Sequence, residues 1–423
     1  MSNEIVGEKS LRSGSWRLGF DIGGTFTDFV LICEESQRMF LHKVLTTPQD
    51  PSTGAFAGIE SLLEKVGLTL ADISQVIHGT TLATNAIIER KGSTVGLLAT
   101  EGFGDLLEMG TEQRYDIHDL FLNFPEPLVP SNRRKEISER IDRDGRILTP
   151  MESKQLRNQI CALIEEGIEA LAICFLNAYI NPSHEREARD LVNSEFPNLP
   201  VSISSDILPR IREYERCSTT TANSYVQPIM TAYVSKLETA LKKHGFCGRF
   251  HLIQSSGGLT AIKTAHETPI RFLESGPAGG VQATAMIGRS IDKLDILSFD
   301  MGGTTAKAAL IESGLPAVAP MLEVGRVHRF KKGSGLPVFV PVIDMIEIGA
   351  GGGSIARVDT LGLLKVGPDS AGADPGPACY GLGGSEATVT DANMFLGFLD
   401  PSYFLGGKMK LKRILTHHLT TLS

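Results

Sequence analysis

The sequence predicts an α/β fold built from two related half-domains, and three observations support this prediction. Apolar runs of strand length alternate with helical segments along most of the chain. A short phrase, Asp-x-Gly-Gly-Thr, occurs twice, at Asp21 and at Asp300, 279 positions apart. The 44 glycines among 423 residues indicate many tight turns. Together these features favour two similar units arranged around one shared ligand.

Each copy of the phrase has the pattern of a strand, a tight turn and a second strand. Apolar residues precede each aspartate, and further apolar runs follow at 29–32 and 308–311. Two glycines can form a plain hairpin turn, but they also let a phosphate approach backbone N–H groups closely. Because the phrase is duplicated with matched flanks, we favour a phosphate site. Its candidate residues are Gly23, Gly24, Thr25, Thr27, Gly302, Gly303, Thr304 and Thr305.

The aspartate of each copy stands at the end of its first strand, where it would face the phosphates. Such carboxylates can hold Mg²⁺ through water, because this ion keeps much of its hydration shell. We therefore expect Asp21 and Asp300 to converge on one metal ion and to act in catalysis. The pair of loops resembles the arrangement in actin, sugar kinases and heat-shock ATPases, which implies duplicated ribonuclease H-like half-domains.

Composition excludes several classes of function. The net charge is −8 and the pI is near 5.8, without a dense basic block, so nucleic acid is not an expected partner. The polar start of the chain does not read as a secretory signal, and no stretch approaches transmembrane length, so no membrane partner is expected. Six scattered cysteines without a Cys-x-x-Cys pair fit reduced thiols in a cytoplasm.

The order of predicted elements is that of an α/β protein. Helices are expected at about 53–66, 82–90, 154–166, 183–193, 212–243 and 274–287, the fifth of them interrupted at Pro228. Strands are expected at 41–45, 75–77, 95–99, 170–175, 201–204 and 250–254. We place a second α/β unit at about 137–208.

The segment His78-Gly-Thr-Thr-Leu-Ala-Thr-Asn85 starts one of these helices and is a candidate anion or carbonyl site. The alternative is a simple helix cap, in which the threonines satisfy the terminal N–H groups. Asn85 lies one turn after Thr81 and can face the same side of the helix. We therefore predict that His78, Thr81 and Asn85 hold a substrate carbonyl.

Two further segments carry dense polar or small residues. The charges of Arg212-Glu-Tyr-Glu-Arg216 could form a solvated helix cap or a functional site. Residues 274–280 begin a helix, and Gly276 and Gly279 suit either a bound phosphate or close helix packing. Gly349 to Gly353 could be a nucleotide loop or a flexible turn. Asp344, Glu347, Asp374 and Asp391 are polar candidates without an assigned role.

An ordered set of motifs resembles the hydantoinase A/5-oxoprolinase family over residues from about 17 to 411. The motifs are Asp21-Ile-Gly-Gly-Thr-Phe-Thr-Asp28, His78 to Asn85, Arg212 to Arg216, Glu274-Ser-Gly-Pro-Ala-Gly-Gly280, Asp300-Met-Gly-Gly-Thr-Thr305, Ile348 to Ser354 and Asp374-Pro-Gly-Pro-Ala-Cys-Tyr380. The resemblance implies ATP and Mg²⁺ as cofactors and an enzyme that opens a cyclic amide such as 5-oxoproline or a hydantoin. It also implies a hydantoinase B-type subunit or domain as partner, and we expect an oligomer.

The resemblance leaves the acceptor open, because relatives include carboxylase subunits that activate acetone or acetophenone. We expect a domain at 1–208 with the first phosphate loop and a domain at 209–411 with the second. Residues 412–423 lose the family pattern, and family chains continue to a further loop beside adenosine. The alternative expectation is therefore a C-terminally truncated, inactive chain that keeps only a partner-binding surface.

Overall fold

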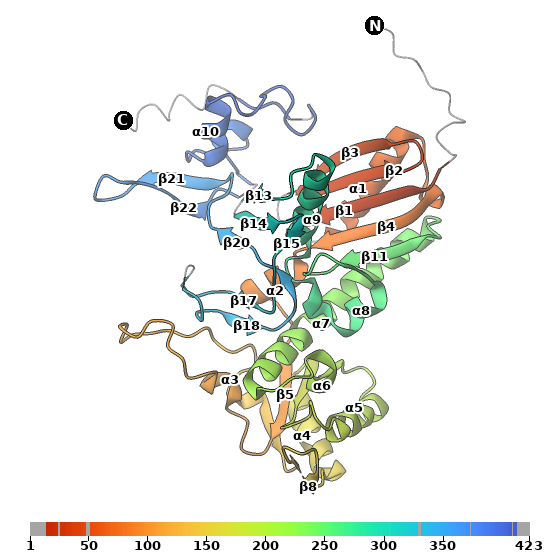
Figure 1. The fold of residues 1–423 in the computed structure, drawn as a ribbon, viewed down its shortest axis with the longest axis vertical. Helices are drawn as coiled ribbons and strands as arrows, with labels where there is room; N and C mark the ends of the chain where they lie inside the picture. The colour runs from red at the N-terminus through yellow and green to blue at the C-terminus, as the bar shows by residue number, and fades with distance from the viewer. Residues whose placement is uncertain are drawn as a thin grey trace.

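The computed structural model describes residues 14–23, 26–47, 51–303, 305–328, 331–372, 374–407 and 409–412. Figure 1 shows an upper sheet, a lower α/β unit and, beside the upper sheet, the strands that follow residue 295. The mixed α/β class predicted from the sequence is confirmed. Within the described residues, no helix is both long and apolar enough to cross a membrane.

The upper sheet has six strands in the order β12-β11-β4-β1-β2-β3. Strands β1, β2 and β3 are antiparallel neighbours, whereas β1, β4 and β11 run parallel. Alternate residues of β1 are buried, which gives this strand one apolar face under α1. The bounds are β1 Trp16–Ile22, β2 Phe26–Cys33, β3 Arg38–Leu45, α1 Pro51–Val66, β4 Ile73–Thr80, β11 Arg249–Ile253 and β12 Leu259–Ala261.

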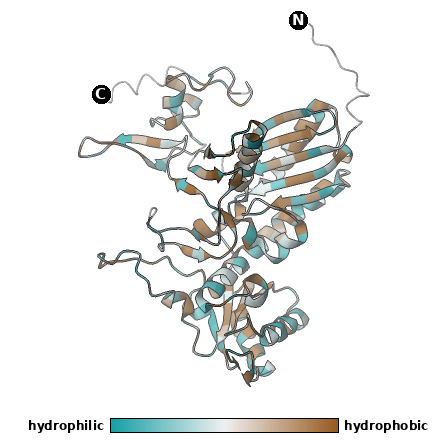
Figure 2. Cartoon of the chain, viewed as in Figure 1, coloured by the Kyte–Doolittle hydropathy of each residue, from teal (hydrophilic) through white to brown (hydrophobic). Residues whose placement is uncertain are grey.

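The lower unit contains a four-stranded parallel sheet in the order β10-β9-β5-β6. Every residue of β5 and β9 is buried, as expected for central parallel strands covered on both faces. Figure 2 shows these strands as largely apolar and α5 as largely hydrophilic. The bounds are β5 Val95–Thr100, β6 Arg134–Ile137, α4 Ser153–Glu165, β9 Ala170–Cys174, α5 Ser183–Glu195 and β10 Val201–Ile203. The domain boundary at 208/209 stays a prediction, although β11 and β12 follow it and complete the upper sheet.

Helix α7, Glu213–Lys243, lies between the two sheets and contacts elements of both units. The sequence predicted an interruption at Pro228, but the helix is continuous through this residue. A proline removes one backbone hydrogen bond, and here burial on both sides compensates, since Val226 and Met230 are fully buried. The predicted interruption was therefore wrong.

The strands after residue 295 form a smaller sheet in the order β13-β14-β15, in which β20 also pairs with β14. Helix α9 packs on this sheet, with its Val281 and Ala285 in one apolar cluster with Ile311 of β14. The main bounds are α9 Ser275–Ser290, β13 Ile296–Met301, β14 Ala306–Glu312, β15 Leu315–Pro316 and β20 Ile346–Ile348.

Short strand pairs and helices complete the described chain. The strand pairs are β7 Arg140–Ile141 with β8 Ile147–Thr149, β16 Val318–Ala319 with β19 Val342–Ile343, β17 Leu322–Val324 with β18 Leu336–Val338, and β21 Ser354–Val358 with β22 Leu364–Ser370. The remaining helices are α2 Leu82–Ile88, α3 Leu106–Met109, α6 Ser204–Ile207, α8 Ile262–Glu267 and α10 Val389–Phe395, with 3₁₀ turns η2 Leu70–Asp72, η3 Ser131–Arg133, η4 Pro269–Phe272 and η5 Ala378–Tyr380.

Candidate nucleotide and acceptor site

The two copies of the repeated phrase form hairpins with the same register and the same turn bond. Asp21 pairs with Asp28 across β1 and β2, and Asp300 pairs with Lys307 across β13 and β14. The N–H of Gly23 donates to Phe26 at 2.9 Å, and the N–H of Gly302 donates to Thr305 at 2.9 Å. The duplication therefore holds at the level of the hairpin. The predicted residues Gly24, Thr25 and Thr304 lie outside the described residues.

Asp21 is a half-buried carboxylate at the end of a central strand, and its Oδ1 atom is fully buried. Burial is the main cause that raises its pKa to about 6, and the nearby carboxylates of Asp28 and Asp300 add to this effect. The cations of Lys307 and Lys43 act in the opposite direction. Its Oδ1 atom is buried without a hydrogen-bond partner. In native proteins such an atom is usually satisfied by an ordered water, an ion or a ligand.

Two glycines provide the space for the Asp21 carboxyl group. A Cβ atom at Gly276 would lie 2.4 Å from Oδ1 of Asp21, and one at Gly79 would lie 2.9 Å from it. The same Cβ at Gly79 would lie 3.1 Å from the Cα of Gly276. These glycines therefore let β4 and the start of α9 approach Asp21 closely. This close approach explains why a residue without a side chain stands at position 276.

His78 supports the strand that carries Asp21. The hydroxyl of Tyr233 lies 2.7 Å from Nε2, and Nδ1 lies 3.2 Å from the carbonyl oxygen of Phe20. A carbonyl accepts only, so Nδ1–H donates and Nε2 accepts from the tyrosine. Complete burial lowers the pKa of the imidazole to about 4, which keeps it neutral. Both ring nitrogens of His78 are therefore engaged within the protein in this structure. A direct contact between His78 and a substrate stays a prediction.

The start of α2 is joined to the start of α9. The N–H of Thr80 donates to Oγ of Ser275 at 2.9 Å, and this hydroxyl donates to the carbonyl of Thr80 at 2.8 Å. Nδ2 of Asn85 donates to Oγ1 of Thr81, four residues earlier, at 3.4 Å. Both residues therefore lie on one side of α2, as predicted. Thr84 lies on the adjacent face of α2, and its Oγ1 accepts a hydrogen bond from the N–H of Glu274 at 3.0 Å.

The remaining predicted phosphate ligands differ in position. Thr27 is buried, and its Oγ1 lies 3.1 Å from that of Thr46, which donates to the carbonyl of Gly23 at 2.8 Å. Thr27 thus supports the base of the first loop. A Cβ at Gly279 would lie 3.0 Å from Ile253, so this glycine serves the packing of α9 on β11. Thr305 closes the second turn through its carbonyl.

The second loop is covered by the glycine-rich segment 349–353. The N–H of Gly352 donates to Gly302 at 2.8 Å, and the N–H of Gly353 donates to Gly303 at 2.7 Å. A Cβ at Gly353 would lie 3.0 Å from the carbonyl oxygen of Gly303. The segment is therefore an ordered support for the loop, held by backbone bonds. Asp391 is a buried capping residue that accepts from Cys379, Thr388 and Ala378, and Asp374 is exposed.

The charges at the start of α7 do not form a solvated cap, because Glu215 and Arg216 are buried. The guanidinium of Arg216 donates to Ser204 at 2.9 Å and to the carbonyl of Phe175 at 2.7 Å. The motif therefore joins α7 to the lower unit. All six cysteines are free thiols.

Sequence reasoning missed Lys307 and the role of Glu274. The two side chains form an ion pair and are 14% and 12% exposed. The pair connects the second hairpin to the residue before α9, next to Asp21. The signal that could have identified Lys307 is its position in the repeat, because it stands where Asp28 stands in the first copy.

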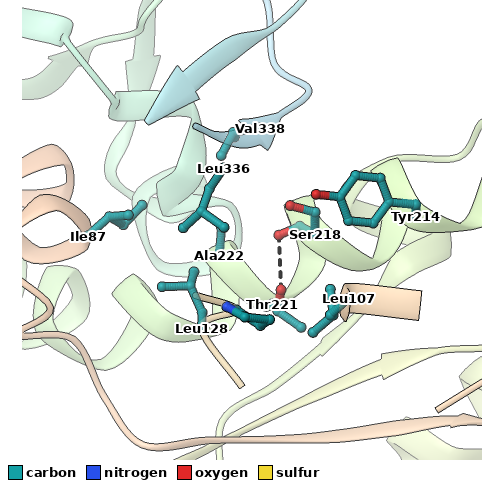
Figure 3. Close-up of a pocket in the computed structure, with 10 residues that line it drawn as sticks. Ile87, Leu107, Leu128, Tyr214, Ser218, Thr221, Ala222, Leu336 and Val338 are labelled. Atoms are coloured by element: carbon teal, nitrogen blue, oxygen red, sulfur yellow. Dashed lines mark hydrogen bonds between the residues drawn. The ribbon is translucent and has the colours of Figure 1, made fainter. Parts of the chain in front are cut away.

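A void between α2, α7 and β18 is too small to be the substrate site. Figure 3 shows Ile87, Leu336 and Val338 on one side and Tyr214 and Ser218 on the other. Its volume is about 10 Å³, close to the minimum for one water molecule. It marks imperfect packing at the junction of the units.

The aspartates fit a hydrated cation better than a cage of protein ligands. No cluster of three or more histidine, cysteine, aspartate or glutamate side chains that could hold a metal occurs among the described residues. Mg²⁺ usually takes one or two carboxylates and keeps several waters. The unpaired Oδ1 of Asp21, with the Asp300 carboxylate near enough to raise its pKa, matches this requirement.

The fold and the site together define a mixed α/β protein with two matched glycine turns that each carry an aspartate. The chain belongs to the hydantoinase/oxoprolinase family. The model of the hydantoinase/oxoprolinase N-terminal region matches residues 17–196, and the hydantoinase/oxoprolinase model matches residues 216–422.

Two relatives illustrate this similarity. The caprolactamase subunit alpha of Pseudomonas jessenii is 37% identical over 404 residues, which are 94% of this chain and 57% of the relative. A 5-oxoprolinase of Arabidopsis thaliana is 32% identical over 426 residues, which cover 92% of this chain and 32% of that protein. The chain therefore spans little more than half, or less, of the length of these relatives.

Two solved structures share the backbone. An ATP-dependent acetone carboxylase in its nucleotide-free form matches 95% of this chain and 57% of its own, with a TM-score of 0.79 and 29% identity. The ATP-dependent caprolactamase from Pseudomonas jessenii covers the same shares, with a TM-score of 0.77 and 36% identity.

Proposed function

We propose that this chain is the ATP-binding part of an enzyme that phosphorylates the carbonyl oxygen of a cyclic amide of the hydantoin or 5-oxoproline type. The observation that carries the proposal is the buried, unpaired Oδ1 of Asp21 beside two matched glycine turns. The caprolactamase relative, whose name states action on a lactam, supports the acceptor class. Duplicated ribonuclease H-like half-domains around one nucleotide belong to the same proposal.

Phosphorylation would solve the chemical difficulty of an unstrained amide, which is a poor electrophile. The carbonyl oxygen attacks the γ-phosphorus, and the bond to the bridging oxygen breaks with its electron pair leaving on ADP. Two waters then complete the reaction: the first adds at carbon and the ring C–N bond breaks, and the second releases phosphate. The net reaction converts cyclic amide, ATP and two waters to the ring-opened acid, ADP and phosphate; this acid is an amino acid for a lactam and a carbamoyl amino acid for a hydantoin.

The residues of the site would divide this work. Loop backbone around Gly23, Gly302 and Gly303 would hold phosphate oxygens, with Gly24, Thr25 and Thr304 as further proposed ligands. Asp21 and Asp300 would bind hydrated Mg²⁺, which supplies charge neutralisation at the phosphates when bound. The N–H groups of Gly23 and Gly302 already close their turns, so other donors of each loop would contact the ligand.

A partner would be needed for ring opening. The caprolactamase relative is named a subunit, which supports an assembly of several chains. We propose a hydantoinase B-type subunit or domain as that partner, in an oligomer.

Mg-ATP hydrolysis tests the proposal. Phosphate release would be measured with hydantoin, 5-oxoproline or a ketone, each with and without a hydantoinase B-type partner. We expect release that depends on a cyclic amide. If the chain binds no nucleotide under any of these conditions, the proposal is wrong and a partner-binding chain without turnover takes its place.

A ketone-activating carboxylase subunit is the second candidate, and the acetone carboxylase backbone favours it. The two candidates differ in their second substrate. Carboxylation requires bicarbonate and yields a keto acid, whereas amide hydrolysis requires only water. ATP hydrolysis that a ketone stimulates only in the presence of bicarbonate would identify the carboxylase.

A further inference from the structure

A cavity of about 310 Å³ lies between α2 and the strands that follow residue 305. Its walls include Thr84 and Ile88 of α2, Lys307 of β14, Glu347 of β20 and Glu274 before α9. Figure 1 shows α2, β17 and β20 around this part of the molecule. The volume is at the lower end of the range for small-molecule pockets, which suits a small ring.

The cavity has an apolar surface opposite Lys307. This surface is built from β16, β17, β19 and the residues between them: Ala319, Met321, Leu322, Val342, Ile343 and Met345. Apolar walls with a few polar groups at one end are typical of sites that orient a small organic molecule.

The charges of the cavity largely cancel in pairs. Lys307 is paired with Glu274, and the Nε of Arg326 lies 2.9 Å from Oε2 of Glu323. Outside these pairs, the described lining carries the exposed carboxylates Asp344 and Glu347 and the exposed Lys332. Among the described lining residues, no buried cation is therefore left over for a substrate carboxylate, and burying such a charge without a partner is costly.

Lys307 connects this cavity to the phosphate site. It stands directly opposite Asp300 in the second hairpin. Its ammonium also interacts with Asp21, the buried carboxylate of the first hairpin. Lys307 is therefore the lining residue that connects the wall of the cavity to both aspartates.

We propose that this cavity is the acceptor pocket, that Lys307 contacts the acceptor's carbonyl oxygen, and that the pocket takes a small uncharged cyclic amide in preference to one bearing a carboxylate. The inference rests on the carbonyl phosphorylation set out under the proposed function. It narrows the acceptor from a hydantoin or 5-oxoproline type to a small cyclic amide without a carboxylate. It also shifts the acceptor from the side of α2 with Thr81 and Asn85 to the side with Thr84 and Ile88, about 60° around the helix.

The sharpest test compares two lactams that differ in one group, 2-pyrrolidone and 5-oxoproline. Both have the same five-membered ring, but only the second carries a carboxylate. Binding to the 423-residue chain would be measured directly by ligand-observed NMR, without nucleotide. We expect 2-pyrrolidone to bind at least about tenfold more tightly. Equal or tighter binding of 5-oxoproline, or no binding of either lactam, would overturn the inference.

Two variants locate the binding site. Met321→Trp should fill the cavity and weaken 2-pyrrolidone binding at least about tenfold, whereas Leu361→Trp, at an exposed turn, should not change it. Lys307→Met should weaken it similarly, with Lys365→Met on exposed β22 as the matched control. Unchanged binding in Met321→Trp would refute the pocket even if Lys307→Met failed to fold.

Nucleotide binding, measured separately by titration with ATP, distinguishes the two proposals. If ATP does not bind but 2-pyrrolidone binds and Met321→Trp abolishes this, the proposed function fails and the pocket stands. If ATP binds and its hydrolysis rises with 2-pyrrolidone equally in the parent chain and Met321→Trp, the proposed function stands and the pocket is refuted.

Discussion

The two hairpins share a sequence phrase, a register and a turn bond, but they lie in different surroundings. Strand β1 is central in a six-stranded sheet, with β2 on one side and β4 on the other. Strand β13 pairs only with β14 among the described strands and lies at the edge of its sheet. Asp21 is consequently enclosed by Gly79 and Gly276, whereas Asp300 is exposed.

The difference shows that local sequence sets the turn while the neighbours set the chemistry. The first hairpin places Asp28 opposite its aspartate, and the second places Lys307 there. Burial, with Asp28 adding to its effect, destabilises the ionised form of the first carboxylate, whereas the second stands opposite a lysine. The first loop holds unsatisfied negative charge, which a cation or a phosphate-bound metal would relieve.

The largest expected effect comes from removing the exposed aspartate. Asp300→Ala should lower Mg-ATP hydrolysis at least about 100-fold, because the proposed metal-side carboxylate is lost. The melting temperature should stay close to that of the parent, since the side chain is exposed. Phosphate release and thermal unfolding measure the two outcomes. Glu312→Ala, at the exposed far end of β14, is the control, and unchanged hydrolysis in Asp300→Ala would remove Asp300 from the mechanism.

Substitution of Asp21 should instead change the free energy of unfolding and its dependence on pH. The pKa of Asp21 rises from 3.8 to about 6 on folding, so ionisation penalises the folded state. The penalty is absent below about pH 4 and complete above about pH 6, where it amounts to about 2–3 kcal/mol. Asp21→Asn should therefore stabilise the chain by about this amount at pH 8 and hardly at all at pH 4.

Urea unfolding of parent and variant at both pH values measures this effect. Asp300→Asn is the matched control, and its stability should differ from the parent by less than about 0.5 kcal/mol at pH 8, since the side chain is exposed. A stabilisation that is equal at pH 4 and pH 8 would mean that the Asp21 carboxylate is not strained by burial.

Close packing around the first aspartate can be tested at two glycines of α9. Gly276→Ala would place a methyl group 2.4 Å from Oδ1 of Asp21, so we expect a loss of about 1–3 kcal/mol and weaker nucleotide binding. Gly280 has open space at its Cβ position, so Gly280→Ala should be neutral or stabilise by up to about 1 kcal/mol. Equal effects of the two substitutions on stability and on nucleotide binding would show that close packing of Gly276 against Asp21 is not required.

The smallest effect is expected behind the first hairpin. Tyr233→Phe removes the donor to Nε2 of His78 and should cost about 1 kcal/mol, because a buried acceptor loses its partner. Hydrolysis should change little if His78 acts only as a support. Chemical unfolding and phosphate release measure both, with Tyr403→Phe at an exposed position as control. A large fall in hydrolysis at unchanged stability would instead point to a direct role for His78.

Local patterns predicted much of the fold. The helix expected at 82–90 is α2, Leu82–Ile88, and the strand expected at 95–99 is β5, Val95–Thr100. These predictions succeeded because apolar periodicity and turn residues act over short distances. The interruption at Pro228 failed because a long buried helix tolerates one missing hydrogen bond.

The candidate site was only partly predictable for the same reason. The sequence identified both aspartates through their repeat and identified Gly276 through its motif. It missed the Lys307–Glu274 ion pair, because the two residues belong to different motifs and meet only when α9 packs beside the second hairpin. Thr81 and Asn85 stay predicted acceptor ligands, and the proposed pocket borders the neighbouring residues Thr84 and Ile88 of α2.

The sequence by itself determined the α/β class, the family and the duplicated glycine turn, because the residue types that form these features are neighbours along the chain. The tertiary structure decided which aspartate is buried, which charges are paired and where the cavity lies. Strand order and helix packing govern these properties, since desolvation and Coulomb interactions depend on what surrounds a group in space. Two copies of one phrase therefore became a buried, strained carboxylate and an exposed one beside a lysine.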